Sequence, residues 1–592
     1  NNIWLGNREG VSLLKYQNNK WEIEKTFNKS NNTAFSSNIV TSLSLHNNGL
    51  FVGTRGAGVI TIKKTEKRFN NFYKTNQRGS LFNNLTRAMY EDSHQNLWIG
   101  DEEAGVSFLK KGNSYENGFV QISVNDNTND RAYVFKETLA TGKNKKNIMW
   151  VGTSYFKALV AIDINTLKPI PQPVKISNSL GFVFSIEKVG ENTLWVGSYE
   201  RGLWRLKIND VGVIESAKQF MPNDNKNGVI SHIIRSILLD KDGDLWISTD
   251  RGLNRIRKTE LEKENPFFES FNSEKYNFNI NRHYLLQLLE AGNKIWIGSM
   301  GGGLINYDKK NNTFSSITTA DGLPSNTVKS IQESNGILWL STNAGITKYN
   351  PQTNNIVNYD KDDNLIENEF SEICSVKRAD GTILFGSNKG VTYFNPKEIL
   401  TEKTLPILFF SDLKINNQSV KVGRLYENRI ILTQTIEKTK EINLKYSENN
   451  FSISFTGLHF NNASKDKFKY MLEGFDKKWI HASSSYRTAQ YTNIHEGVYY
   501  FKVLGANSDN IWNVEPIVLK IKIDPPFSRS ILARILYLFV LILLAYIAYK
   551  ISNSFIIKRK QLIISKIEKE NAEKLVQYKL QFFTNISHEF KT

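Results

Sequence analysis

Cysteine and histidine are scarce in this chain. Cys374 is the only cysteine among 592 residues, which excludes an intrachain disulfide and a zinc site built from cysteine pairs. The 8 histidines show no cluster linked to a repeat. An enzyme that needs converging histidine and carboxylate groups is therefore disfavoured, and we expect no metal site.

Acidic residues are the scarcer charge, with 58 Asp and Glu against 76 Lys and Arg, which leaves a formal net charge of +18. Such an excess can indicate nucleic-acid binding. The basic residues are scattered, however, and no recognised nucleic-acid module is present. We interpret the charge as a solvated basic surface that weakly favours anionic ligands, without direct contact to nucleic acid.

Long uncharged runs are also rare, and the exception lies near the C-terminus. Residues 531–549 contain a single charge, Arg534, which can snorkel to the membrane interface. At about 1.5 Å per residue, the run nearly spans a hydrocarbon core of about 30 Å. We therefore predict a transmembrane helix at 531–551, in preference to a buried helix of a soluble core.

Basic residues follow this run, beginning with Lys550, Lys558 and Arg559. By the positive-inside rule, residues 552–592 are cytoplasmic and residues 1–530 lie outside the inner (cell) membrane. This topology requires export, yet the sequence starts without Met or a signal-peptide pattern. We expect both ends of the sequence to be cut.

Aromatic residues are abundant, and a bias toward Trp, Tyr and Phe favours β-sheet. A strand that ends in an aromatic residue, an aliphatic residue and Gly or Ser recurs nine times, with the aromatics 43 to 52 residues apart. This is the blade spacing of a β-propeller. The repeated aromatics, which we expect to pack between blades, are Trp4, Phe51, Trp98, Trp150, Trp195, Trp246, Trp296, Trp339 and Phe385.

The segment Asp240-Lys241-Asp242-Gly243-Asp244 has the acidic spacing of a calcium loop. An EF-hand loop needs Glu at its twelfth position, and Arg251 stands there instead. We interpret the segment as a turn that precedes a blade strand.

The connector Asp321-Gly322-Leu323-Pro324-Ser325-Asn326, together with the repeats, resembles the propeller repeats of two-component regulators. In that family the extracellular sensor commonly has two seven-bladed propellers. Nine repeats do not fill fourteen blades. We therefore expect 80–400 to form one complete propeller and 1–79 to be remnant blades of another; a single irregular ring of eight or nine blades is the alternative.

Residues 401–524 lack the Trp repeat and alternate in a way that suits an antiparallel sandwich, notably over 468–476 and 497–503. This region resembles the Tyr-rich immunoglobulin-like domain that follows such propellers, where its role is transmission. The expected fold class is mainly β: propeller blades, an Ig-like sandwich, one transmembrane helix and a cytoplasmic coiled-coil helix.

We expect 552–592 to be helical, with a coiled-coil seam that contains one polar position, Asn571. The seam positions follow one another at steps of three or four residues and are Ile564, Ile567, Asn571, Leu575, Tyr578 and Phe582. A parallel homodimer follows from this pattern.

The last eleven residues read FFTNISHEFKT and place His588 beside Glu589, with Thr592 one turn on. A neutral imidazole nitrogen is available as a nucleophile near neutral pH. The string resembles the phosphoacceptor H-box of sensor histidine kinases. The resemblance implies that His588 is phosphorylated, that Glu589 is its acid/base helper and that Thr592 positions water in phosphatase mode.

The resemblance implies a transmembrane sensor histidine kinase that detects an outside oligosaccharide and passes a phosphoryl group from His588 to an Asp of a response-regulator receiver domain. ATP with Mg²⁺ is then bound by another domain of the parent protein. None of the expected nucleotide-binding boxes occurs before Thr592, so we expect no autophosphorylation by this chain alone. The alternatives are a membrane-anchored propeller sensor with a transcription-factor output and a propeller lyase.

Overall fold

The computed structural model describes residues 2–17, 19–32, 35–46, 49–63, 68–124, 131–139, 146–154, 157–222, 228–271, 276, 278–459, 465–482 and 485–589. The chain divides into two compact units. Unit 1 comprises Asn1–Pro406, Leu458–Lys467 and Ala506–Trp512, and unit 2 comprises Ile407–Gly457, Phe468–Gly505 and Asn513–Thr592.

Unit 1 contains, within its described residues, seven four-stranded antiparallel sheets, which carry repeats three to nine. In six of these sheets, four consecutive strands lie side by side, because short turns join them. The first four sheets consist of β8 (Thr86–Glu91), β9 (Leu97–Asp101), β10 (Val106–Leu109) and β11 (Phe119–Ile122); β12 (Val134–Thr138), β13 (Ile148–Gly152), β14 (Leu159–Asp163) and β15 (Lys168–Ile170); β16 (Phe182–Val189), β17 (Thr193–Tyr199), β18 (Leu203–Ile208) and β19 (Ile214–Phe220); and β20 (Ile234–Leu239), β21 (Leu245–Thr249), β22 (Gly252–Ile256) and β23 (Phe268–Ser270).

The remaining three sheets have the same strand order, except that the fourth strand of the last sheet comes from an earlier part of the chain. They consist of β24 (Tyr284–Ala291), β25 (Lys294–Met300), β26 (Leu304–Asp308) and β27 (Thr313–Ile317); β28 (Val328–Ser334), β29 (Ile337–Thr342), β30 (Gly345–Asn350) and β31 (Asn355–Tyr359); and β32 (Phe370–Lys377), β33 (Ile383–Ser387), β34 (Gly390–Phe394) and β7 (Asn70–Phe72). The connections hold short helices: α1 (Val174–Ser179), η1 (Lys258–Glu260), η2 (Ile280–Arg282), η3 (Thr319–Asp321) and η4 (Lys361–Asp363).

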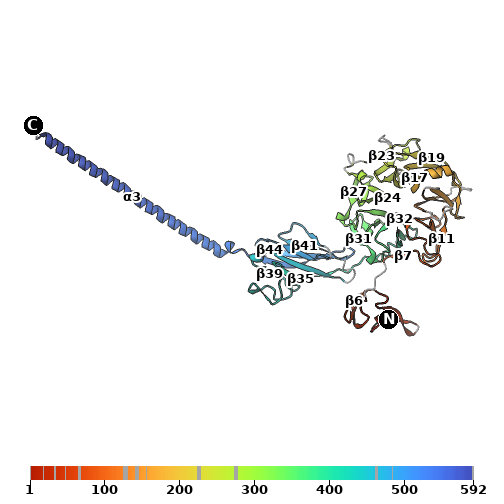
Figure 1. Ribbon diagram of the computed structural model, residues 1–592, viewed down its shortest axis with the longest axis horizontal. Coiled ribbons are helices and arrows are strands. Elements are labelled where there is room, and N and C mark those ends of the chain that lie inside the picture. Colours follow the sequence, from red (N-terminus) through yellow and green to blue (C-terminus); the bar gives the residue numbers. More distant parts are fainter. Residues whose placement is uncertain are drawn as a thin grey trace. The chain divides into compact units, whose positions relative to one another are not determined.

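The seven sheets close into a ring (Figure 1). The first strand of each sheet contacts the first strands of its two neighbours, and β32 contacts β8. Strand β7 pairs antiparallel with β34, with Phe72 opposite Val391, and so completes the last sheet. The propeller therefore includes β7, which lies before residue 80, the start predicted from the repeat pattern. The repeat pattern misses this strand because a pairing across the ring leaves no periodic signal in the sequence.

The repeated aromatic residue lies on the second strand of each sheet. In the first six sheets it packs against the next sheet, whereas Phe385 of the last sheet clusters with Trp339 of the preceding one. Trp246 of β21 is fully buried and clusters with Leu285 and Ile295 of the following sheet. The glycine that follows the Trp-aliphatic pair lies where neighbouring sheets crowd together. A Cβ atom added at Gly100 would lie 2.4 Å from the carbonyl oxygen of Ala132 in the following sheet.

Repeats one and two form two three-stranded sheets. They consist of β1 (Asn2–Gly6), β2 (Val11–Gln17) and β3 (Lys20–Phe27), and of β4 (Val40–His46), β5 (Gly49–Thr54) and β6 (Gly58–Lys63). The two sheets share a small core around Val11 and Val52, while Ile23 and Val59 are exposed. The predicted fold class, with one seven-bladed propeller and a partial one, is confirmed.

Unit 2 begins with a β-sandwich whose two sheets face each other across one apolar core that includes Phe455, Phe501 and Leu519. One sheet consists of β36 (Gln418–Ser419), β35 (Ile407–Ile415), β40 (Phe451–Leu458) and β43 (Thr488–Tyr491). The other consists of β39 (Glu441–Leu444), β45 (Ile517–Ile523), β44 (Gly497–Ala506), β41 (Lys467–Glu473) and β42 (Ile480–Ala482). A hairpin of β37 (Leu425–Tyr426) and β38 (Arg429–Ile430), and the short helix η5 (Tyr446–Glu448), lie in the connections.

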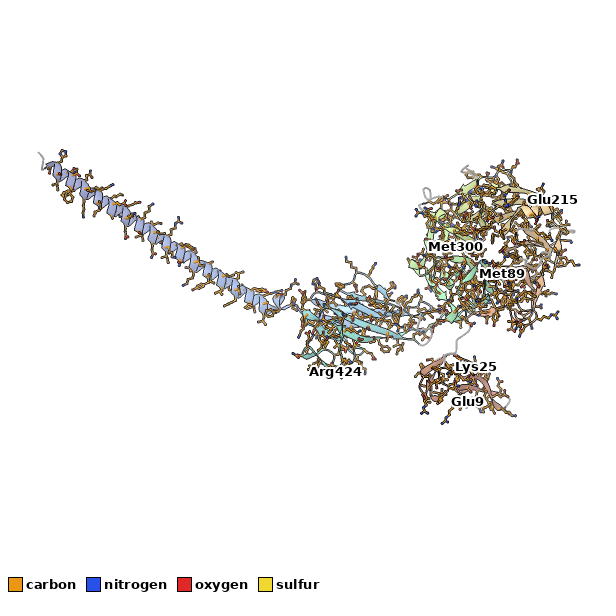
Figure 2. All side chains as sticks on the ribbon, in the orientation of Figure 1. Glu9, Lys25, Met89, Glu215, Met300 and Arg424 are labelled. Atoms are coloured by element: carbon orange, nitrogen blue, oxygen red, sulfur yellow. The ribbon has the colours of Figure 1, made fainter. Side chains whose placement is uncertain are left out.

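A single helix, α3 (Ile531–Glu589), forms the C-terminal part of unit 2 and follows η7 (Phe527–Arg529). Its 59 residues give a length of about 90 Å at about 1.5 Å per residue. Figure 2 shows its side chains standing out along most of the helix, and Ala533 near its start is its one buried residue among those that the structure describes.

Candidate functional site

The apolar segment predicted from the sequence is the first part of α3. Ser530 caps the helix, because its Oγ accepts a hydrogen bond from the backbone N–H of Ala533 at 3.2 Å. The side chains of Leu536, Phe539 and Leu544 are 52, 64 and 60% exposed, whereas the core of a soluble protein buries such residues. Among the described residues, α3 is long and apolar enough to cross a membrane.

The predicted coiled-coil seam lies on the second part of α3. Its apolar members are all exposed, namely Ile564, Ile567, Leu575, Tyr578 and Phe582. The helix runs from the apolar segment through this seam to Glu589 without a break. A rotation or displacement at one end of α3 can therefore reach the other end through one hydrogen-bonded element.

His588 lies in the last turn of α3, and its side chain is exposed. At 100° per residue, it stands about 80° from Tyr578 and about 120° from Phe582 around the helix axis. The imidazole is therefore clear of the predicted seam and open to solvent. Glu589 is the next residue and is exposed as well, whereas Thr592 lies outside the described residues.

The acidic segment that begins at Asp240 forms a turn. The backbone N–H groups of Asp242 and Asp244 donate to Asp240 Oδ1 at 3.0 and 2.9 Å. Lys309 Nζ lies 3.3 Å from Asp240 Oδ2, 2.6 Å from Asp242 Oδ2 and 2.7 Å from Glu290 Oε1. This ammonium group therefore occupies the position that a cation would take, and its pKa is raised because the three carboxylates outweigh the effect of burial.

A cavity of about 390 Å³ lies among the first strands of the propeller. We call it the ring cavity, because Arg87, Phe184, Arg235 and Glu372 in its lining belong to β8, β16, β20 and β32, the first strands of four sheets of the ring. Charged and aromatic side chains converge in this cavity in a way that could serve a function.

Arg235 is the most buried cation of the ring cavity, with 5% of its surface exposed. Its Nη2 lies 2.5 Å from Glu372 Oε2. Its guanidinium carbon lies 4.7 Å from the ring centroid of Phe184 and 5.6 Å from that of Tyr284. One carboxylate and two aromatic faces thus stabilise a charge that burial alone would disfavour.

The sequence pattern nominates none of the ring-cavity residues. Arg87 and Arg235 lie far apart in the chain and share no motif, because the ring brings them together only after all sheets have formed. A weak signal exists in Phe182-Val183-Phe184, which places two aromatic residues on the same face of a first strand.

Comparison with protein families identifies two regions of the chain. Residues 228–251 and 322–344 match the two component regulator propeller, and residues 459–524 match the Y_Y_Y domain. The predicted propeller repeats and Tyr-rich domain are confirmed. The first propeller match includes the turn at Asp240 and the strand of Trp246, and the second begins within the connector, at Gly322.

The chain is similar to Histidine kinase P4 of Formosa agariphila, with 28% identity over 541 residues; the match covers 89% of this chain and 38% of that protein. A similar solved structure is the extracellular domain described as that of a hybrid two-component system, BT3049, from B. thetaiotaomicron. It has a TM-score of 0.63 and 21% identity, and the match covers 88% of this chain and 66% of that one. The chain thus spans less than half the length of this kinase and shares the fold of this extracellular domain.

Proposed function

We propose that this chain is the sensory, membrane-spanning and phosphoacceptor part of a transmembrane histidine kinase in a two-component phosphorelay. The observation that carries the proposal is that α3 joins an exposed apolar segment to His588 without a break. The similarity to Histidine kinase P4 and the two family matches support it. In this topology 1–530 lie outside the inner membrane and 552–592 lie in the cytoplasm.

His588 is the phosphoacceptor in this proposal. A neutral imidazole nitrogen attacks the γ-phosphorus of ATP; the N–P bond forms while the bond to the bridging oxygen breaks, and ADP leaves with the electron pair. Glu589 holds or accepts the proton of the other ring nitrogen, and Thr592 positions the hydrolytic water when the protein acts as a phosphatase. A separate domain of the parent protein binds ATP with Mg²⁺, and the phosphoryl group then passes to an Asp of a receiver domain.

Two copies of α3 pair in parallel along the seam. The exposed apolar seam residues, such as Ile564 and Leu575, become buried in the pair, and Asn571 fixes the register because a polar residue in a seam tolerates few partners. The dimer places two copies of His588 on the outside of one helix pair, within reach of an ATP-binding domain.

The ligand in this proposal is an oligosaccharide bound outside the membrane. It must bind two states of the sensor with different affinity, because a ligand with equal affinity for both states shifts nothing. The difference between the two states reaches His588 through α3.

Phosphotransfer tests the proposal directly. The chain is reconstituted in lipid nanodiscs and incubated with labelled ATP, Mg²⁺ and an ATP-binding domain of a histidine kinase of this class. We expect a label that acid removes and base does not, as for a phosphoramidate, and its loss in His588→Gln. His495→Gln, at an exposed histidine of the sandwich, is the matched control and keeps the label. A label that persists in His588→Gln contradicts the assignment.

A further inference from the structure

The ring cavity combines cationic and aromatic side chains in a way that selects a class of ligand. We propose that it binds an acidic sugar, whose carboxylate or sulfate group pairs with Arg131 and Arg235 and whose apolar ring face packs on Phe184. The inference rests on the proposed sensory function and specifies the ligand for it. The volume of about 390 Å³ lies within the range of small-molecule sites, about 300–1,000 Å³.

Arg235 supplies a donor that the folded chain leaves unused. Its Nε is buried and has no hydrogen-bond partner among the residues that the structure describes, although Nη2 is paired with Glu372. Native structures rarely leave a buried N–H without a partner, because desolvation without compensation is costly. An anionic oxygen in the cavity would satisfy this donor with a charge-assisted hydrogen bond.

The backbone beside Glu372 is held in a strained form. Ile373 has a φ of 53°, a left-handed conformation that a β-branched residue rarely adopts. The register between β32 and β33 shifts between Phe370 and Ser375, so the strained residue lies within a bulge. Bulges redirect side chains, and this one places both Glu372 and Ile373 in the cavity lining.

Aromatic rings form one wall of the ring cavity. The ring centroids of Tyr133 and Phe184 are 4.9 Å apart, and those of Phe184 and Tyr199 are 5.7 Å apart. All three side chains are only half-buried, so part of each ring faces solvent in the cavity. Such a wall fits the apolar C–H face of a sugar ring, whereas a simple inorganic anion would leave it uncovered.

The charges of the lining favour an acidic ligand over a neutral one. Three arginines face two glutamates in the cavity, which leaves an excess of one positive charge. Arg87 Nη2 lies 2.5 Å from Glu102 Oε1, and Arg235 is paired with Glu372. Arg131 is exposed and is hydrogen-bonded to the side chain of Tyr133, while Glu102 and Glu103 act on it only through longer-range electrostatics. A ligand anion can therefore approach Arg131 without displacing an existing ion pair.

Calorimetry with the full chain in lipid nanodiscs tests this inference. The probes are trigalacturonate and a chondroitin sulfate disaccharide, with maltotriose as the neutral sugar and inorganic sulfate as the anion without a ring. We expect saturable binding of at least one acidic sugar, with maltotriose and sulfate at least about tenfold weaker. Binding of the acidic sugar weakens as NaCl is raised, because salt screens the exposed arginine.

Substitutions then locate the site. Arg131→Ala changes an exposed side chain that folding does not require, and we expect it to weaken the acidic sugar by about tenfold or more. Phe184→Leu keeps an apolar side chain but removes the ring face, and we expect a loss of several-fold. Arg78→Ala, at an exposed arginine of the propeller outside the cavity lining, is the matched control and leaves the affinity unchanged.

Three outcomes overturn the inference: no acidic sugar binds, maltotriose binds equally well, or Arg131→Ala and Phe184→Leu both keep the wild-type affinity to within about twofold. None of them affects the phosphotransfer assay at His588, which needs no sugar. A chain that accepts phosphate at His588 but fails these tests retains the proposed function and loses only this ligand site.

Discussion

His459 in unit 1 is held between two carboxylates. Its Nδ1 lies 2.7 Å from Asp466 Oδ1 and its Nε2 lies 3.2 Å from Glu402 Oε1. A carboxylate only accepts, so both ring nitrogens must donate and the imidazole must be protonated. His459 and Asp466 are 4 and 2% exposed. A buried positive charge therefore balances buried negative charge at this point.

Burial disfavours the charged form of His459, but the hydrogen bonds that its ring donates to Asp466 and Glu402 outweigh this effect and raise the pKa of His459 from 6.5 to about 9. A raised pKa in the folded state stabilises the fold fully below pH 6.5, and this contribution is lost as the pH rises through about 9. At about 1.4 kcal/mol per pH unit, the difference corresponds to roughly 3 kcal/mol.

His459→Phe keeps the bulk of the ring and removes both donors. The variant removes the cation that faces the buried carboxylate of Asp466. Asp466 Oδ2 already has no hydrogen-bond partner among the described residues, so this carboxylate has little to replace the lost imidazolium. Removing one partner of a buried ion pair costs about 3–5 kcal/mol. We expect the urea midpoint of the full chain in nanodiscs, followed by Trp fluorescence at pH 7, to fall accordingly.

The pH dependence separates this charge effect from a packing effect. Between pH 7 and pH 9.5 the wild-type midpoint falls, whereas that of His459→Phe falls less because the titrating group is gone. Adding Asp466→Asn to the variant recovers part of the loss, since the uncompensated charge disappears. His495→Phe, at an exposed histidine, serves as the control. Equal midpoints for wild type and His459→Phe at pH 7, or parallel pH profiles, would refute the reasoning.

Two further predictions concern the propeller. Phe72→Ala removes a ring that is 4% exposed and stacks on Tyr115, with the ring centroids 4.7 Å apart. We expect the free energy of unfolding in urea to fall by about 3–5 kcal/mol and proteolysis at residues 68–79 to become faster. Unchanged protease resistance argues against closure of the ring by β7. Trp246→Phe removes the hydrogen bond that Trp246 Nε1 donates to Asp240 Oδ2 at 2.8 Å. The comparison is Trp195→Phe, because Trp195 Nε1 has no hydrogen-bond partner among the described residues. We expect Trp246→Phe to lower the free energy of unfolding by about 1–3 kcal/mol more than Trp195→Phe does. Equal losses in the two variants contradict the role given to this hydrogen bond.

Most of the architecture can be predicted from patterns among residues that are close together in the sequence. The spacing of Trp98, Trp150 and their equivalents predicts one sheet per repeat, because each blade is built from neighbouring segments of the chain. The uncharged run after Arg534 predicts the apolar helix for the same reason, since α-helix length and side-chain polarity are local properties. The place of His588 on the helix face away from the seam also follows from helical periodicity alone.

The tertiary structure decided whatever depends on residues far apart in the chain. Thr392 donates a hydrogen bond at 2.7 Å to Asn71, which lies 321 positions earlier in the chain, and this closure of the ring has no periodic signature. The ion pair of Arg235 with Glu372 and the protonated His459 between Glu402 and Asp466 exist for the same reason. The sequence by itself determined the repeats and the apolar helix, and it carries the string around His588 from which the phosphoacceptor role is proposed, because all three are patterns over a few neighbouring residues. Only the fold determined which charges share a cavity, because burial and pairing arise after the sheets have closed into a ring.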